Sequence, residues 1–308
     1  MKKEIINVEA SIRARLQNKA RETHRPFAEV LQYYAMERFL YRLGQSKYTD
    51  KFILKGALMF TVWQAPQRRT TLDIDFLARY DNVIAKLENA AREVCKIKVV
   101  PDGLVFDAGT ITGQKIKEDA DYEGVRIKFK GFLEKSRIPM QMDVAFGDVV
   151  YPRPESIDYP VILDFPKPHL KGYPIESVVA EKFEAAMKLG LLNSRMKDFY
   201  DLWLMTRQFD FDGARLTEAL KRTFAHRKTA LPEKPPLFSE EIYDEKSDRQ
   251  MLWKAFLTKN QNKQAPETLK EVGRIIESFL TEPVDAIHCN IGFDKTWKST
   301  GPWSRPHG

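Results

Sequence analysis

The segment from Phe52 to Phe76 constrains the fold of this chain most strongly, because it sets two carboxylates inside an apolar frame. It reads FILKGALMFTVWQAPQRRTTLDIDF and ends in an Asp-x-Asp pair, Asp73 and Asp75. Successive side chains of a β-strand point to opposite faces of the sheet. We therefore expect a strand over residues 71–77 with both carboxylates on one face and three apolar residues facing the core: Leu72, Ile74 and Phe76.

A third strand carboxylate, Asp143, lies in the alternating run IPMQMDVAF at residues 138–146. Neighbouring carboxylates repel each other unless a cation bridges them, and Mg²⁺ prefers oxygen ligands and often shares its shell with substrate phosphates. The Lys55-Gly56 turn offers backbone N–H groups that could hold phosphate oxygens, with Thr71 nearby. Three strand carboxylates together with a glycine turn and a nearby hydroxyl favour phosphoryl transfer. Spacing alone also allows a simpler interpretation, an exposed aspartate pair and an aspartate at a strand edge or turn.

Composition excludes several classes of protein. The chain has 308 residues, of which 43% are hydrophobic and 30% charged, and these values are ordinary for a globular protein. No apolar run approaches the roughly 18 residues of a membrane span, and the Met-Lys-Lys-Glu start does not resemble a signal peptide. Two cysteines, Cys95 and Cys289, favour a reduced, cytoplasmic setting. The net charge of +7 indicates either a polyanionic partner such as RNA or merely a basic surface.

Hydrophobic periodicity predicts the order of elements in the first half. Residues 8–43 read as two helices separated at His24-Arg25-Pro26, and the first helix is basic, as a solvated face or as an RNA-facing surface. A strand at 52–54, a helix at 58–63 and a helix at 83–94 surround the Asp-x-Asp strand. Alternating runs at 97–100, 104–106, 125–129 and 138–146 predict an antiparallel meander with one wet face.

The second half reads as helical after a proline-rich connection at residues 152–174. We expect a helix at 175–189 that ends before Gly190, a helix that opens at 193–198 and runs to 209, and two or three more helices. One of these covers residues 268–280. From about residue 285 the tail is predicted to be irregular, with a disordered end at 304–308.

Several motifs together resemble the AbiEii/AbiGii toxin family, nucleotidyltransferase-like proteins of the DNA polymerase β superfamily. The motifs are FLYRLGQSKYTDKFILKGALMF, RRTTLDIDF, MDVAFGD, and EKFEAAMKL followed by RMKDFYDLW, and the similarity covers about residues 8–210. It implies an α+β fold: a polymerase-β-like nucleotidyltransferase domain with a mixed or antiparallel sheet, plus a helical C-terminal domain. The expected division is N-terminal helices at 1–50, the nucleotidyltransferase domain at 51–165 and the helical domain at 166–308.

The resemblance also implies roles for individual residues. The implied ligands of Mg²⁺ or Mn²⁺ are Asp73, Asp75 and Asp143, and Asp143 is also the implied acceptor-activating carboxylate. Lys182 corresponds to the family's lysine that contacts the nucleotide phosphates, and Asp198 corresponds to the family's final essential aspartate. The remaining nucleotide-binding candidates are Lys55, Gly56, Arg69 and Thr71. The turn is Gly56-Ala57 where the family has Gly-Ser or Gly-Gly, which removes a hydroxyl but keeps the backbone turn.

Simpler interpretations exist for the two helical residues. Lys182 would ordinarily face solvent, and Asp198 would serve equally as a helix N-cap. Asp201, one helical turn after Asp198, is expected to pair with Lys182 or Arg195.

The implied function is that of a metal-dependent nucleotidyltransferase toxin in a type IV toxin–antitoxin or abortive-infection system. It would transfer a nucleotide from an NTP to an acceptor, with the 3′ end of tRNA as the expected class and a separately encoded antitoxin as the partner. A transferase that modifies a protein or small molecule fits the fold equally well, and an inactive nucleotide-binding module is the third possibility.

Overall fold

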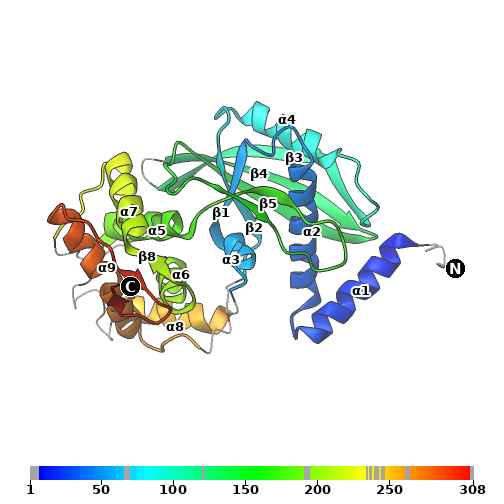
Figure 1. Cartoon of the computed structure of the whole chain (residues 1–308). Coiled ribbons are helices and arrows are strands. Elements are labelled where there is room, and N and C mark those ends of the chain that lie inside the picture. The colour runs from blue at the N-terminus through cyan, green and yellow to red at the C-terminus, as the bar shows by residue number, and fades with distance from the viewer. Residues whose placement is uncertain are drawn as a thin grey trace. The chain divides into compact units, whose positions relative to one another are not determined.

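The computed structural model describes residues 7–65, 70–119, 122–190, 195–233, 235, 238, 243, 247–260 and 264–305. They form two compact units. The first, here the sheet unit, comprises Met1–Gly147 and Glu155–Gly172, and the second, the helical unit, comprises Asp148–Pro154 and Tyr173–Gly308. Figure 1 labels strands β1–β5 of the sheet unit and helices α5–α9 of the helical unit.

A seven-stranded sheet in the order β3-β4-β5-β2-β1-β7-β6 forms the centre of the sheet unit. β2 runs parallel to β5 and antiparallel to β1, β1 runs parallel to β7, and β3, β4 and β5 form an antiparallel meander. The sheet is therefore mixed, which confirms the predicted α+β fold. The strands are β1 Phe52–Lys55, β2 Asp73–Ala78, β3 Leu104–Asp119, β4 Tyr122–Leu133, β5 Ser136–Phe146, β6 Glu155–Asp158 and β7 His169–Gly172.

One face of this sheet is the main hydrophobic core. Ile74 and Phe76 of β2 are fully buried and pack in one cluster with apolar residues of α2 and α4. The predicted alternation of β2 is confirmed for these two residues. It is wrong for Leu72, which precedes the strand and is 59% exposed. The helical elements of the unit are α1 Val8–Glu22, α2 Phe27–Gly44, a 3₁₀ turn η1 Gly56–Leu58, α3 Met59–Val62 and α4 Ile84–Cys95.

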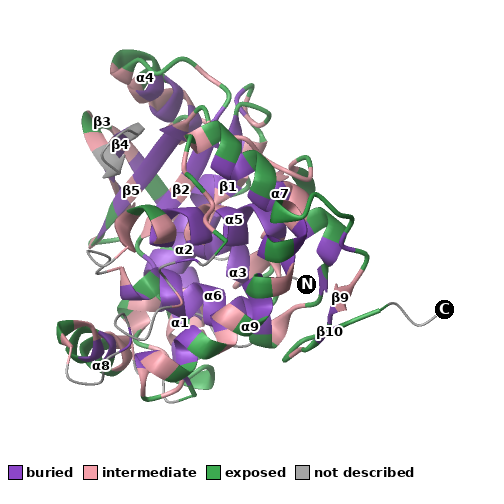
Figure 2. Cartoon of the chain, turned by 90° about the vertical axis from the view of Figure 1, so that its left-hand side faces the viewer, coloured by how far each residue is buried: buried purple, intermediate pink, exposed green. Residues whose placement is uncertain are grey.

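Helix α2 is buried over most of its length (Figure 2). It begins after Pro26, whose extended backbone caps the helix. A helix buried all round must pair its charged residues. Arg42 does so by a two-pronged bond to Asp102, with Nη1 2.6 Å from Oδ2 and Nη2 3.0 Å from Oδ1. This pair attaches the loop before β3 to α2.

The basic helix α1 is partly neutralised by its own unit. Arg13 Nε lies 3.9 Å from Glu134 Oε2, the Arg15 guanidinium lies 3.1 Å from Asp164 Oδ2, and Lys19 pairs with Glu22 in the same helix. Exposed pairs of this kind contribute little to stability, about 0–1 kcal/mol each. They nevertheless cancel part of the positive charge that an RNA-facing surface would use.

The expected strand at residues 97–100 is wrong. These residues lie in the loop between α4 and β3. Pro101, which has no N–H to donate to a ladder, follows them, and the buried Asp102 pairs with Arg42 instead of a strand.

The helical unit contains five helices among its described residues, beginning with the predicted α5 and α6. Helix α5 packs on α6 and α7, and α6 packs on α8 and α9. The bounds are α5 Ile175–Leu189, α6 Met196–Gln208, α7 Gly213–Arg227, α8 Asp248–Asn260 and α9 Leu269–His288.

The C-terminal tail is largely irregular after α9, as predicted, but it contains two short strands that the sequence did not indicate. Helix α9 continues to His288, and β8 Phe211–Asp212, β9 Thr296–Trp297 and β10 Trp303–Ser304 form a small antiparallel sheet. Two indole N–H groups fix the tail: Trp297 donates to the Thr206 carbonyl at 2.9 Å and Trp303 to the Phe279 carbonyl at 2.8 Å. Residues 306–308 of the expected disordered end lie outside the described residues.

Candidate functional site

Asp73 and Asp75 lie on the face of β2 opposite the core. Both are partly exposed, while the intervening Ile74 and the following Phe76 are fully buried. Because side chains alternate along a strand, the two carboxylates emerge on the same side. The prediction that the Asp-x-Asp pair shares one face of a strand is confirmed.

Asp143 joins them on the neighbouring strand. β5 runs parallel to β2 with Asp143 in register with Asp75, so the two side chains emerge on the same face from strands about 4.8 Å apart. Asp143 is 7% exposed. The structure thus brings together the three carboxylates that the sequence suggested, on two adjacent strands.

Gly56 packs directly against the Asp75 carboxylate. β1 places Lys55 in register with Asp75, and Gly56 follows with φ +72°. A Cβ at Gly56 would lie 2.0 Å from Asp75 Oδ2, far inside contact distance. Glycine is therefore required at this position both for its left-handed backbone and for the space that the carboxylate occupies. The departure at Ala57, which is buried, leaves this approach unchanged.

Thr71 belongs to the entry of β2. Its backbone N–H donates to the Tyr33 hydroxyl of α2 at 3.2 Å, and its own hydroxyl lies 3.4 Å from the Asp73 backbone nitrogen. These contacts orient the chain just before the first aspartate. The nucleotide-binding roles of Lys55, Gly56 and Thr71 stay predictions, and Arg69 lies outside the described residues.

Arg126 of β4 is the neighbour that sequence reasoning missed. It stands in register with Asp143 on the other side of β5, and its Nε and Nη2 donate to Asp143 Oδ1 and Oδ2 at 2.8 and 2.6 Å. Gln141 Nε2 adds a longer bond of 3.3 Å to Oδ2. The hydrogen bond to Asp143 raises the pKa of Arg126 above its usual value, with smaller contributions from Asp73 and Asp75. Arg126 belongs to the alternating run at residues 125–129, but alternation along one strand does not indicate which residue of the next strand it contacts.

The donor set suits a hard divalent cation in chemistry, since Asp73, Asp75 and Asp143 offer carboxylate oxygens on one face. Within the described part of the chain, no group of three or more His, Cys, Asp or Glu side chains is arranged to hold a metal ion. In this arrangement the Asp143 carboxylate is engaged by Arg126. Metal ligation by the three aspartates stays a prediction.

The helical unit carries the second set of predicted residues. Lys182 on α5 points its ammonium at two carboxylates of α6, with Nζ 2.7 Å from Asp198 Oδ1 and 2.9 Å from Asp201 Oδ2. The Lys182 side chain is only 13% exposed, so the solvent-facing interpretation is wrong, and the expected pair with Asp201 is confirmed. Asp198 lies in the first turn of α6 rather than at the N-cap, which is Arg195. Its charge there also suits the helix dipole.

A second buried charge cluster involves the middle of α5, at the glutamates on either side of Lys182. Arg227, at the end of α7, lies 2.7 Å from Glu184 Oε2 and 2.9 Å from Asp148 Oδ1. Burial opposes the charge on Arg227, but Glu181, Asp148 and Glu184 outweigh it and raise the pKa of Arg227. The cluster ties the 148–154 segment and α7 to the helix that carries Lys182.

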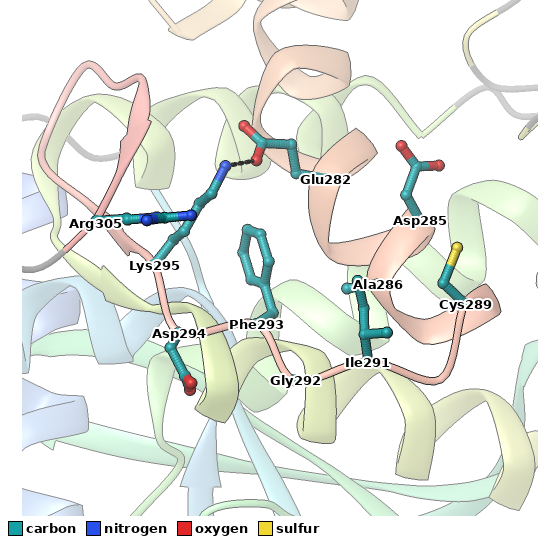
Figure 3. Close-up of a pocket in the computed structure, with 10 residues that line it drawn as sticks. All are labelled: Glu282, Asp285, Ala286, Cys289, Ile291, Gly292, Phe293, Asp294, Lys295 and Arg305. Carbon is teal, nitrogen blue, oxygen red and sulfur yellow. Dashed lines mark hydrogen bonds and ion pairs between the residues drawn. The ribbon is translucent and has the colours of Figure 1, made fainter.

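A cavity of about 660 Å³ lies at the C-terminal end of the helical unit (Figure 3). Its lining runs from Glu282 to Arg305, so it contains none of the predicted site residues. Lys295 of the tail pairs with Glu282 of α9 beside it. This lining does not indicate a reaction, and the aspartate face remains the candidate site.

Comparison with known proteins identifies a family for most of the chain. The family model described as the nucleotidyl transferase AbiEii toxin of a type IV TA system matches residues 38–278, well over half of the chain. This region includes both sets of predicted residues.

Two solved structures resemble the chain at 13% identity. A candidate nucleotidyltransferase from H. pylori has a TM-score of 0.44, with 85% of this chain and 96% of that one covered. JHP933 from Helicobacter pylori has a TM-score of 0.42, with 82% and 89% covered. No curated protein matches the chain. In the part that the structure describes, every helix is too short or too polar to span a bilayer.

Proposed function

We propose a reaction for this chain from one premise: it belongs to the AbiEii nucleotidyl transferase toxin family of type IV toxin–antitoxin systems. The family implies an antitoxin as partner. The proposed reaction is the transfer of a nucleotide from an NTP to an acceptor, with Mg²⁺ or Mn²⁺ as cofactor and the 3′ end of tRNA as the acceptor. The setting would be the cytoplasm, in defence against phage by abortive infection.

The observation that carries the proposal is the set of three carboxylates on one face of β2 and β5. Asp73, Asp75 and Asp143 would hold the metal, and Asp143 would also activate the attacking hydroxyl of the acceptor. When bound, the metal supplies neutralisation of the triphosphate and of the departing pyrophosphate. Gly56 leaves room for the Asp75 carboxylate, and the turn that it begins offers backbone N–H groups to phosphate oxygens.

Lys182 would supply a positive charge to the nucleotide phosphates. Asp198 and Asp201 hold its ammonium at 2.7 and 2.9 Å and so fix its position on α5. A lysine whose ammonium is held in this way acts as an oriented point charge. Asp198 therefore has a positioning role in this proposal.

The net charge of +7 supports an RNA acceptor, since contacts to phosphate provide affinity without reading the sequence. The salt bridges of α1 lessen the support from that helix. An acceptor that is a protein or a small molecule is the main rival, and an inactive nucleotide-binding module is the other. The presence of Asp73, Asp75 and Lys182 argues against the inactive module.

Incubation of the protein with each α-labelled NTP, Mg²⁺ or Mn²⁺, and total cell RNA or lysate tests the proposal. We expect label in tRNA that depends on the metal and is lost in Asp73→Ala. A matched control is Asp158→Ala on β6 of the same sheet, whose exposed carboxylate pairs only with an exposed histidine among the contacts described for it. Circular dichroism should show that both variants fold.

The location of the label decides between the possibilities. Label in protein or in a small molecule would show that the acceptor is of that class and not tRNA. An absence of transfer by the wild-type protein with every NTP would favour the inactive module. Full activity of Asp73→Ala would show that the catalytic assignment is wrong.

A further inference from the structure

Three strands bring an arginine and two aspartates into one row on the sheet face. Arg126 of β4 is in register with Asp143 of β5, which is in register with Asp75 of β2. In-register neighbours emerge on the same side of the sheet, so the row runs cation, carboxylate, carboxylate. Asp73 stands one step further along β2 on the same face.

The bond between Arg126 and Asp143 has the geometry of a strong pair. Two N–H groups of the planar guanidinium meet the two oxygens of the carboxylate at 2.8 and 2.6 Å, and the Arg126 side chain is 31% exposed against 9% for Asp143. Bidentate pairs of this kind are stronger and more specific than a single charged hydrogen bond. An arginine also keeps its charge at every accessible pH, so the cation is permanent.

We propose that Arg126 is a positioning residue of the nucleotidyl-transfer site, which fixes Asp143 on the aspartate face and competes with the divalent cation for that carboxylate. The inference rests on the proposed function, because it concerns the same three aspartates. It adds a residue that neither the Asp-x-Asp motif nor the family resemblance includes.

Competition follows from simple electrostatics. Three carboxylates on adjacent strands repel one another, and Arg126 supplies one positive charge to the cluster in the absence of metal. A divalent ion at Asp73 and Asp75 is in turn repelled by that guanidinium and finds the oxygens of Asp143 already engaged. Arg126 therefore stabilises the metal-free sheet and weakens metal binding. Removal of the Arg126 charge should therefore destabilise the metal-free sheet and strengthen metal binding.

Charge and geometry can be separated with two substitutions. Arg126→Gln removes the charge, whereas Arg126→Lys keeps the charge but cannot form the two-pronged bond. A suitable control is Lys130→Gln, four residues along the same strand on the same face. Lys130 is in register with Asp107 of β3 and Pro139 of β5, so it lies outside the row of Arg126, Asp143 and Asp75. The binding of Mn²⁺ is measured by electron paramagnetic resonance without nucleotide, and thermal unfolding is followed in EDTA and in saturating Mn²⁺.

We expect Arg126→Gln to bind Mn²⁺ at least about fivefold more tightly than wild type, as loss of a nearby cation requires at moderate salt. Its melting temperature should fall in EDTA and rise more than that of wild type when Mn²⁺ is added. Arg126→Lys should stay within about twofold of wild type in Mn²⁺ affinity but transfer nucleotide about tenfold more slowly, because Asp143 loses its two-pronged hold. Lys130→Gln should resemble wild type in all measurements.

Equal or weaker Mn²⁺ binding by Arg126→Gln overturns the inference, as does an absence of Mn²⁺ binding in both proteins. Neither measurement needs a nucleotide or an acceptor. Consequently, a wild-type protein that transfers no nucleotide, but shows the expected change in Mn²⁺ affinity, would refute the proposed function and leave the competition between Arg126 and the cation established.

Discussion

Replacement of Gly56 by alanine tests how closely the turn after β1 fits the aspartate face. Gly56 has φ +72°, a region that costs a residue with a Cβ about 1–2 kcal/mol. The new Cβ would also meet Asp75 at three atoms: Oδ2 at 2.0 Å, Cγ at 2.8 Å and Cβ at 2.9 Å. Rotation of the carboxylate relieves only the first contact, because the Asp75 Cβ is fixed to the backbone of a central strand. Either the turn or β2 must move.

The expected cost combines both effects. Overpacking of a well-packed site costs about 1–3 kcal/mol, so Gly56→Ala should destabilise the sheet unit by about 2–5 kcal/mol in all. At about 2–4 °C per kcal/mol for a unit of this size, its melting temperature should fall by roughly 5–15 °C. A displacement of about 1 Å in a catalytic group can reduce turnover about 100-fold, so nucleotide transfer should fall by a similar factor.

Gly147 offers the matched control. It too has a positive φ, +81°, but a Cβ there would find nothing within 4 Å. Gly147→Ala should therefore show only the backbone cost of about 1–2 kcal/mol and retain transfer. Urea denaturation and the labelled-NTP assay compare the two variants. Equal stability of the two, together with full transfer by Gly56→Ala, would refute the reasoning.

Two further predictions concern buried charges. Lys182→Met leaves Asp198 and Asp201 facing each other without their shared ammonium, and should cost about 3 kcal/mol in urea denaturation, part of which a second change, Asp201→Asn, should restore. Burial raises the pKa of Glu37 to about 7 despite the Arg38 guanidinium, so the folded state keeps a proton that the unfolded state releases above its ordinary pKa of 4.5. Stability should accordingly fall by up to about 3 kcal/mol as the pH rises from 4.5 to 7, and Glu37→Gln should flatten that dependence; a wild-type stability that is constant over this window would contradict it.

Local periodicity in the sequence predicted much of the sheet unit. Asp73 and Asp75 could be placed on one face because the apolar residues Ile74 and Phe76 alternate with them, and burial of one face determines the side on which each residue lies. The pair between Lys182 and Asp201 could be predicted in part for a related reason, since helical spacing limits which side chains share a face.

Long-range pairing could not be predicted in the same way. Arg126 meets Asp143 because of the register between β4 and β5, and Arg42 meets Asp102 across 60 positions of the chain. Neither pair is marked by a periodic pattern in the local sequence. The two-residue strands of the tail are likewise too short to show alternation, and the indole hydrogen bonds of Trp297 and Trp303 that order them are tertiary contacts.

The same alternation couples the candidate site to the stability of the sheet. A slip of one residue in β2 would turn Ile74 and Phe76 outward and bury Asp73 and Asp75 in the core. Each buried, unpaired carboxylate costs several kcal/mol, so the apolar face excludes the slipped register far more strongly than the polar face could. The core face of β2 therefore holds the aspartates in place, while Arg126 and Gly56 act on the opposite face, where they adjust charge and space without determining the register.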